Sequence, residues 1–148
     1  MTELPLVLDA AGLDALAASR PPELFRALLA EAYRRGREVI APSVVCAEVA
    51  RGRARTRALE AAVSRHDRAR GERPAVRLVD TDFGLARQVG ALLHSTGHGT
   101  EHIVDAHVVA VCIPAGGGLV VTSDMDDISA LAAAVPAVRV RTIRPCLG

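Results

Sequence analysis

Leu6-Val7-Leu8-Asp9 and Val120-Val121-Thr122-Ser123-Asp124 are the two stretches that decide the fold. In each, a short apolar run leads into an aspartate, which is typical of a buried strand in a parallel sheet. In an open α/β sheet, ligands bind in the crevice beyond the carboxyl ends of the strands. The two runs therefore predict strands of one sheet, with Asp9 and Asp124 directed at a common pocket.

The remaining apolar residues alternate between strand and helix spacing along the chain. Strands are expected at 4–8, 39–40, 76–79, 119–121 and 138–140, and helices at 13–17, 24–32, 44–49, 85–93, 101–113 and 125–134. The arginine-rich stretch 51–77 is expected to begin with a further helix that has a wide solvated face and buries Ala58, Leu59, Ala62 and Val63. Ser43 and either Thr81 or Asp82 are expected to cap helices, and 94–100 and 71–74 to be loops. Strands that alternate with helices predict an α/β fold of three layers, α/β/α, with a central and mainly parallel sheet.

The length and composition favour one domain over residues 1–148. Half of the residues are hydrophobic but only 2% are aromatic, so the core must be built from small aliphatic side chains. All 18 basic residues are arginine, which is more typical of a GC-rich genome than of specialised phosphate binding. Three widely spaced cysteines, no signal peptide and no apolar run of about 20 residues predict a cytoplasmic protein with no membrane association.

Two further acids, Glu48 and Asp105, lie among apolar residues with helical spacing. A carboxylate beside a core is costly unless it is paired or binds a cation. The chain contains no lysine to neutralise these acids, so with Asp9 and Asp124 they suggest a divalent metal site. Taken singly, each acid has an ordinary alternative as a helix cap, a solvated residue or an ion-pair partner.

Other polar residues near these acids have weaker indications. Asp126 and Asp127 suit the first turn of a helix. The histidines at 94, 98 and 102 resemble metal ligands by type, but their Gly, Ser and Thr neighbours favour a solvated loop. Glu101 lies four residues before Asp105 and could share its helix face.

Four motifs together resemble the PIN-domain family, and within it the VapC-type toxins of bacterial toxin-antitoxin modules. They are Val7-Leu8-Asp9-Ala10, Ala41-Pro42-Ser43-Val44-Val45 leading to Glu48, Ile103-Val104-Asp105-Ala106-His107-Val108-Val109-Ala110, and Val120-Val121-Thr122-Ser123-Asp124-Met125-Asp126-Asp127-Ile128. Each motif alone is only weakly specific for the family. Their order and intervals, which extend over nearly the whole chain, are more specific for it.

The resemblance implies a metal-dependent endoribonuclease toxin that cleaves RNA phosphodiester bonds with a metal-activated water. It implies Mg²⁺, or alternatively Mn²⁺, as the cofactor, a homodimer, and inhibition by a cognate antitoxin protein. The catalytic acids would be Asp9, Glu48, Asp105 and Asp124. The metal ligands would be Asp9, Asp105 and Asp124, with Asp127 or, less closely, Asp126 assisting through water. Many relatives have Ser, Thr or Asn shortly after the first Asp, where this chain has Ala10, Ala11 and Gly12.

Arginines Arg51, Arg53 and Arg55 begin a basic stretch that could grip RNA phosphates, present a solvated face or dock an acidic antitoxin segment. A response-regulator receiver also has an acidic Mg²⁺ pocket, but it normally needs a lysine that this chain lacks. The other alternative is a PIN-like scaffold that binds RNA or protein with little catalysis. Metal-dependent cleavage separates this scaffold from a nuclease.

Overall fold

A computed structural model describes residues 3–67 and 73–146 of the chain. The strands are β1 (Leu6–Leu8), β2 (Val39–Pro42), β3 (His66–Asp67), β4 (Arg73–Pro74), β5 (Arg77–Val79), β6 (Gly117–Val121) and β7 (Arg139–Ile143). The α-helices are α1 (Ala10–Ala17), α2 (Glu23–Arg34), α3 (Cys46–Val49), α4 (Arg53–Val63), α5 (Phe83–Thr96), α6 (Ile103–Ala110) and α7 (Met125–Ala132). Two 3₁₀ turns, η1 (Ser43–Val45) and η3 (Thr100–His102), precede α3 and α6.

In the described part of the chain, five strands form a parallel sheet in the order β5-β2-β1-β6-β7. Leu8 of β1 pairs with Val121 of β6, so these two central strands end side by side. The strands β3 and β4 form a separate antiparallel pair. Because β1 lies between β2 and β6, the strand order reverses at β1, and this reversal opens a crevice at the carboxyl ends of β1 and β6.

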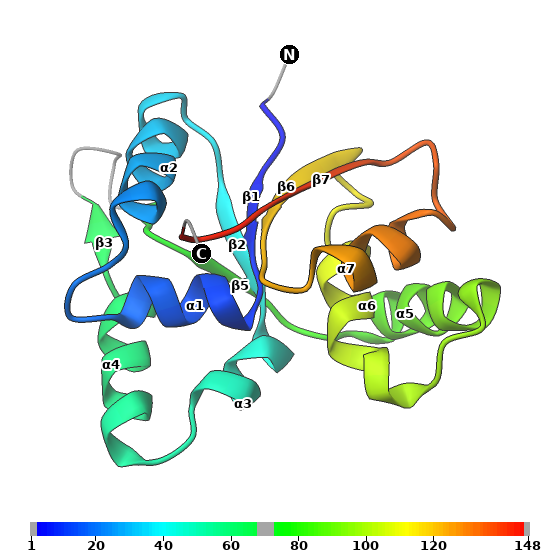
Figure 1. Ribbon diagram of the computed structural model, residues 1–148, viewed down its shortest axis with the longest axis horizontal. Helices are drawn as coiled ribbons and strands as arrows, with labels where there is room; N and C mark the ends of the chain where they lie inside the picture. The colour runs from blue at the N-terminus through cyan, green and yellow to red at the C-terminus, as the bar shows by residue number, and fades with distance from the viewer. Residues whose placement is uncertain (1–2, 68–72, 147–148) are drawn as a thin grey trace.

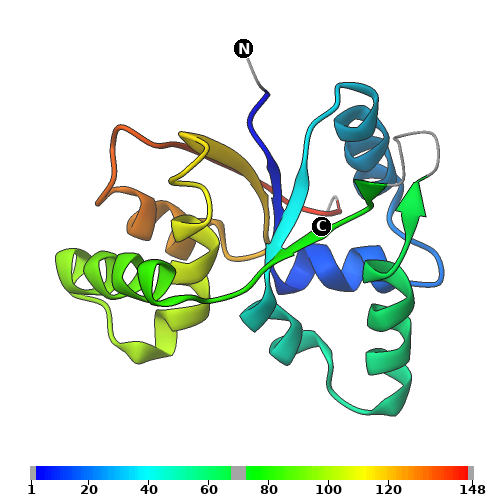
Figure 2. The same cartoon turned by 180° about the vertical axis from the view of Figure 1, so that it is seen from behind.

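Helices cover both faces of the sheet. The helices α1–α4 lie on one side and α5–α7 on the other (Figure 1), and the view from behind shows the same division (Figure 2). All three residues of β1 are buried between these layers, and Phe25 of α2 is the largest fully buried side chain among the described residues. The expected three-layer α/β/α fold with a parallel sheet is therefore confirmed.

Several local expectations are wrong. Ser43 does not cap a helix, because its hydroxyl hydrogen-bonds Asp80, which lies 37 residues away in sequence. The loop expected at 94–100 begins later, since α5 continues to Thr96 and ends at Gly97 in a left-handed conformation. The loop expected at 71–74 includes strand β4 at Arg73–Pro74, and residues 71–72 lie outside the described ones. Asp82 caps α5 as expected, accepting a 2.8 Å hydrogen bond from the Leu85 amide.

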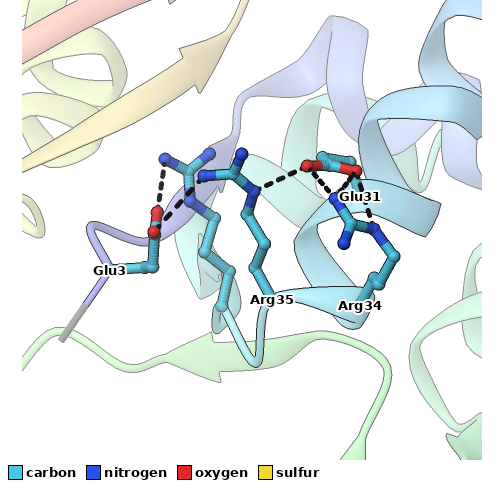
Figure 3. Close-up of polar contacts among 5 residues, drawn as sticks. Glu3, Glu31, Arg34 and Arg35 are labelled. Atoms are coloured by element: carbon cyan, nitrogen blue, oxygen red, sulfur yellow. Dashed lines mark hydrogen bonds and ion pairs between the residues drawn. The ribbon is translucent and has the colours of Figure 1, made fainter.

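Several arginines are engaged at the amino-terminal end of the sheet. Glu31 of α2 contacts both Arg34 and Arg35, and Arg35 reaches Glu3, which precedes β1 (Figure 3). Because Asp9 follows β1, this network lies at the end of the strand opposite to that acid. These arginines therefore serve local ion pairs away from the crevice. No helix of the described residues is long and apolar enough to cross a membrane.

Candidate metal centre

Asp9 stands at the junction between β1 and α1. Its carboxylate accepts a 3.2 Å hydrogen bond from the Gly12 amide and so caps α1, while only 5% of the residue is exposed. The pKa of Asp9 is raised from 3.8 to about 6. The main cause is burial, and the negative charge of Asp124 acts in the same direction. Asp9 is thus both a helix cap and a buried acid with a neighbouring like charge.

Thr122, the residue after β6, links the two strand ends. Its fully buried hydroxyl oxygen accepts a 2.9 Å hydrogen bond from the Asp124 amide. The same hydroxyl interacts with the carboxylate of Asp9, which lowers the pKa of Asp9 against the effect of burial. Thr122 therefore supplies, from the neighbouring strand, the polar contact that Ala10 and Ala11 do not provide.

Gly12 lies where α1 packs closely on the sheet. A Cβ atom at this position would lie 3.0 Å from the Leu8 Cβ atom and 3.3 Å from the Val121 carbonyl oxygen. A Ser or Thr side chain would meet the same atoms. The absence of a polar side chain at position 12 thus follows from the approach of the helix to β1 and β6.

The other three acids of the predicted set interact electrostatically with Asp9 or with one another. Asp124 occupies the N-cap position of α7 but makes no capping hydrogen bond, so its exposed carboxylate remains available. The pKa of Asp105 on α6 is raised by desolvation and then by the charges of Asp124 and Asp127. The pKa of Glu48 on α3 is raised by desolvation and then by Asp105 and Asp124. The structure therefore brings acids from four separate elements within electrostatic range of one another.

Asp127 and Asp126 differ in position. Asp127 is half-buried on α7, and it offers an oxygen within a group whose ligand atoms all lie within 4.8 Å of one another. The other members of that group are Asp105 and His102. Asp126 is exposed and belongs to no such group among the described residues. Of the two, Asp127 is the one that could assist a metal.

His102 was predicted to be a solvated loop residue, and the structure corrects that expectation. It ends η3 and is partly buried, with its Nδ1 atom 3.7 Å from Oδ2 of Asp105. The spacing of three residues between His102 and Asp105 was the available signal, because residues three apart share one face of a helix. Gly97 and Gly99 are typical of loops, and for this reason the sequence favoured a loop over a helix face shared with Asp105.

The chemistry of this group fits a divalent ion. Carboxylate oxygens are the ligands preferred by Mg²⁺ and Mn²⁺. In the described part of the chain, none of the five acids, Asp9, Glu48, Asp105, Asp124 and Asp127, is ion-paired with an arginine. Desolvation and the charges of neighbouring acids raise the pKa values of Asp9, Glu48 and Asp105, and a bound cation would relieve the repulsion between these charges.

The three arginines predicted to bind RNA lie beyond Glu48. Arg51 is exposed before α4, and Arg53 is exposed on its first turn. Gly52 between them has φ 90°, a backbone conformation that favours glycine. Arg55 is engaged with Asp14 of α1 through a 2.6 Å contact, which ties α4 to α1. Arg51 and Arg53 are therefore better placed than Arg55 to meet a ligand.

Two surface hollows differ in how near their lining residues lie to the five acids in the chain. The larger, of about 790 Å³, is lined by residues including Glu38, Arg77 and Arg87 along the β5 edge, and none of the five acids lines it. A hollow of about 460 Å³ lies between α1 and the C-terminal segment. Ala11 and Ser123 line this smaller hollow and adjoin Asp9 and Asp124 in sequence, and its rim carries Arg20 and Arg144. None of the five acids lines this smaller hollow, but two of its lining residues lie close to Asp9 and Asp124 in the chain.

Comparisons with known proteins place the chain in a family. No curated protein matches the sequence significantly. The structure of FitAB bound to an IR36 DNA fragment has a chain with 16% identity and a TM-score of 0.60, covering 95% of this chain and 94% of that one. The crystal structure of VapBC2 from Rickettsia felis bound to a DNA fragment from their promoter has 14% identity and a TM-score of 0.59, covering 93% of this chain and 97% of that one.

Both similarities extend over nearly the whole fold, and at these identities they show the fold alone. The family comparison is independent of them, because it rests on the sequence, and residues 8–134 match the PIN domain. That range includes Asp9, Glu48, Asp105 and Asp124. The chain therefore belongs to the PIN-domain family.

Proposed function

We propose that this protein is a metal-dependent endoribonuclease and the toxin of a toxin-antitoxin module. The single observation that carries the proposal is the convergence of Asp9, Glu48, Asp105 and Asp124 at the crevice where β1 and β6 end. These residues would be the catalytic acids, over a single domain spanning residues 1–148. Membership of the PIN family supports the assignment.

Asp9, Asp105 and Asp124 would hold the ion, with Asp127 assisting. Mg²⁺ is the expected cofactor and Mn²⁺ an alternative, since both prefer carboxylate oxygens. When bound, such an ion supplies an activated water and neutralises charge on the phosphodiester being cleaved. Thr122 orients Asp9 and the Asp124 backbone, and the Gly12 amide fixes the Asp9 carboxylate. Glu48, an exposed acid on α3, would accept a proton from the reacting groups.

The RNA would approach across exposed arginines. Arg51 and Arg53 are exposed shortly after Glu48 in the chain, and Arg20 and Arg144 line the hollow that Ala11 and Ser123 also line. Arginine forks match phosphate oxygens, so these side chains would position the RNA backbone. Substitution of both Arg51 and Arg53 by Ala should weaken RNA binding and reduce its salt dependence.

The proposed partners are a cognate antitoxin and a second copy of the chain. The similar FitAB and VapBC2 structures, described as bound to DNA fragments, support a module of this kind by the likeness of fold. A cytoplasmic location is part of the same proposal, since RNA and an antitoxin encoded alongside the toxin would be met there.

The test is cleavage of total bacterial RNA by purified protein with Mg²⁺ or Mn²⁺, compared with EDTA. Asp9→Asn and Asp105→Asn are the informative variants, because each removes one charge and keeps side-chain size. Glu60→Gln is a matched control, since Glu60 lies on an exposed part of α4. Discrete fragments that require metal and vanish in both Asn variants, but persist in the control, would support the nuclease.

A folded, metal-binding and antitoxin-free protein that leaves RNA intact would contradict the proposal. The remaining candidate would then be a PIN-like scaffold that binds RNA or protein without cutting it. RNA retention by that uncleaving protein, measured by gel shift, would identify the scaffold.

A further inference from the structure

One feature of the crevice extends beyond the carboxylates. His102 contributes a nitrogen to the group that also contains oxygens of Asp105 and Asp127. Imidazole nitrogen suits borderline ions such as Co²⁺, Ni²⁺ and Zn²⁺, whereas an all-oxygen site suits Mg²⁺. A histidine at this place therefore bears on which ion the centre selects.

The spacing of the three side chains permits shared coordination. Two ligands that each lie about 2.1 Å from an ion can be up to about 4.2 Å apart. The Nδ1 atom of His102 and Oδ2 of Asp105 are 3.7 Å apart, within that limit. The whole group spans 4.8 Å, so a small side-chain adjustment of Asp127 completes the set.

The imidazole ring of His102 has neighbours on two sides. The ring of His98 packs edge-on against it, with ring centres 4.7 Å apart, and Nδ1 of His98 is 2.6 Å from the Thr96 hydroxyl. The other ring nitrogen of His102, Nε2, lies 3.9 Å from a carboxylate oxygen of Glu101. Metal-bound histidines commonly direct their second nitrogen toward a carboxylate, which fixes the tautomer.

We propose that His102 is a nitrogen ligand, beside Asp105 and Asp127, of the ion at the proposed metal centre, and that it shifts the preference of the centre from Mg²⁺ toward Co²⁺, Ni²⁺ and Zn²⁺. This inference rests on the metal centre of the proposed function and goes beyond it by naming an additional ligand and its effect on metal choice. Glu101 and His98 orient the ring and do not touch the ion.

The test measures metal binding in the absence of RNA. Calorimetric titration with Mg²⁺, Mn²⁺ and Co²⁺ compares the wild type with His102→Gln and with His94→Gln, a control on an exposed histidine of α5. The His102 variant should lose about tenfold or more in Co²⁺ affinity and less than about threefold in Mg²⁺ affinity. The His94 variant should match the wild type, and thermal melts in EDTA check that both variants fold.

Two further measurements keep the proposal open to contradiction. In ¹⁵N NMR spectra of the wild type, Zn²⁺ should shift the Nδ1 resonance of His102 strongly and leave that of His94 in place. His102→Asp, which replaces nitrogen by oxygen, should bind Mg²⁺ at least as tightly as the wild type while its Co²⁺ affinity stays low. Equal weakening of all ions in His102→Gln, no weakening, or an unmoved His102 resonance would overturn the proposal.

These results are distinguishable from a failure of the proposed nuclease. Metal binding through His102 by a protein that never cleaves RNA would support this inference and contradict the nuclease. Metal-dependent RNA cleavage, together with an unchanged ion preference in His102→Gln, would support the nuclease and contradict this inference. A wild-type protein that binds none of the ions would contradict both.

Discussion

At the scale of single residues, Asp9 combines two roles that oppose each other. Its carboxylate accepts a hydrogen bond from the Gly12 amide, which favours the charged form, yet burial raises its pKa to about 6. In the unfolded chain its pKa would return to about 3.8. Between these two values the folded protein keeps a proton that the unfolded chain releases, so stability must fall as pH rises through this window.

Asp9→Asn should therefore stabilise the metal-free protein at neutral pH. A pKa rise from 3.8 to about 6 corresponds to up to about 3 kcal/mol of lost stability above pH 6. Asparagine retains the N-cap and removes this loss. Urea denaturation in EDTA at pH 4.5 and pH 7.5 measures the effect, with Glu60→Gln as the control. If the unfolding free energy of the Asn variant depended on pH as strongly as that of the wild type, the raised pKa of Asp9 would be contradicted.

Thr122→Val should weaken the same site from the neighbouring strand. The substitution keeps the shape of a fully buried side chain but removes the oxygen that accepts from the Asp124 amide and contacts Asp9. We expect a loss of about 1–2 kcal/mol in unfolding free energy, because a buried amide loses its acceptor. The Asp9 pKa should rise further and Mn²⁺ affinity should fall. Thr122→Ser, which keeps the hydroxyl, should retain most of both properties.

At the scale of elements, the packing of α1 on the sheet limits what position 12 can hold. Alanine normally stabilises a helix by about 1 kcal/mol relative to glycine. Gly12→Ala should do the opposite and cost about 1–3 kcal/mol, because its Cβ atom would press on Leu8 and the Val121 carbonyl.

The matched control is Gly90→Ala in α5, where, among the described residues, the added Cβ would meet nothing within 4 Å besides its chain neighbours and the nearby backbone of its own helix. The unfolding free energy of Gly90→Ala should rise by about 0.5–1 kcal/mol. Denaturation curves of both variants measure the contrast. A Gly12 variant as stable as the Gly90 variant would show that α1 shifts readily and that the crevice is not rigidly framed.

The elements also show what the sequence could predict. The apolar runs before Asp9 and Asp124 predicted the strands and the parallel sheet, because buried parallel strands have that composition. The proximity of the four acids followed from their places at strand and helix ends. Their roles as catalytic residues and metal ligands stay predictions.

Long-range partners were beyond prediction from local patterns. Ser43 looked like a helix cap, and its actual partner, Asp80, is 37 residues away. The contact of Thr122 with Asp9 depends on β6 lying beside β1, which spacing along the chain does not reveal. His102 was misread because adjacent glycines outweighed its three-residue spacing from Asp105.

At the scale of the whole molecule, the acidic crevice couples folding stability to divalent ions. An ion that binds only the folded chain stabilises it by about 2.7 kcal/mol at about 100 times its Kd. Thermal melts at pH 7.5 should therefore show a higher Tm in Mg²⁺ than in EDTA. NaCl at equal ionic strength should give a much smaller change, and the Asp9→Asn, Asp105→Asn double variant should lose the Mg²⁺ response. An unchanged wild-type Tm would contradict a metal centre.

The strand order also determines at which stage of chain synthesis the acidic crevice can form. Strand β6 inserts between β1 and β7, so Asp9 and Asp124 become neighbours only after most of the chain has been made. A polypeptide still emerging from the ribosome has Asp9, Glu48 and Asp105 but lacks the strand that carries Asp124 beside them. The complete acidic crevice is thus postponed until synthesis is nearly finished, so an incomplete chain cannot assemble all four acids.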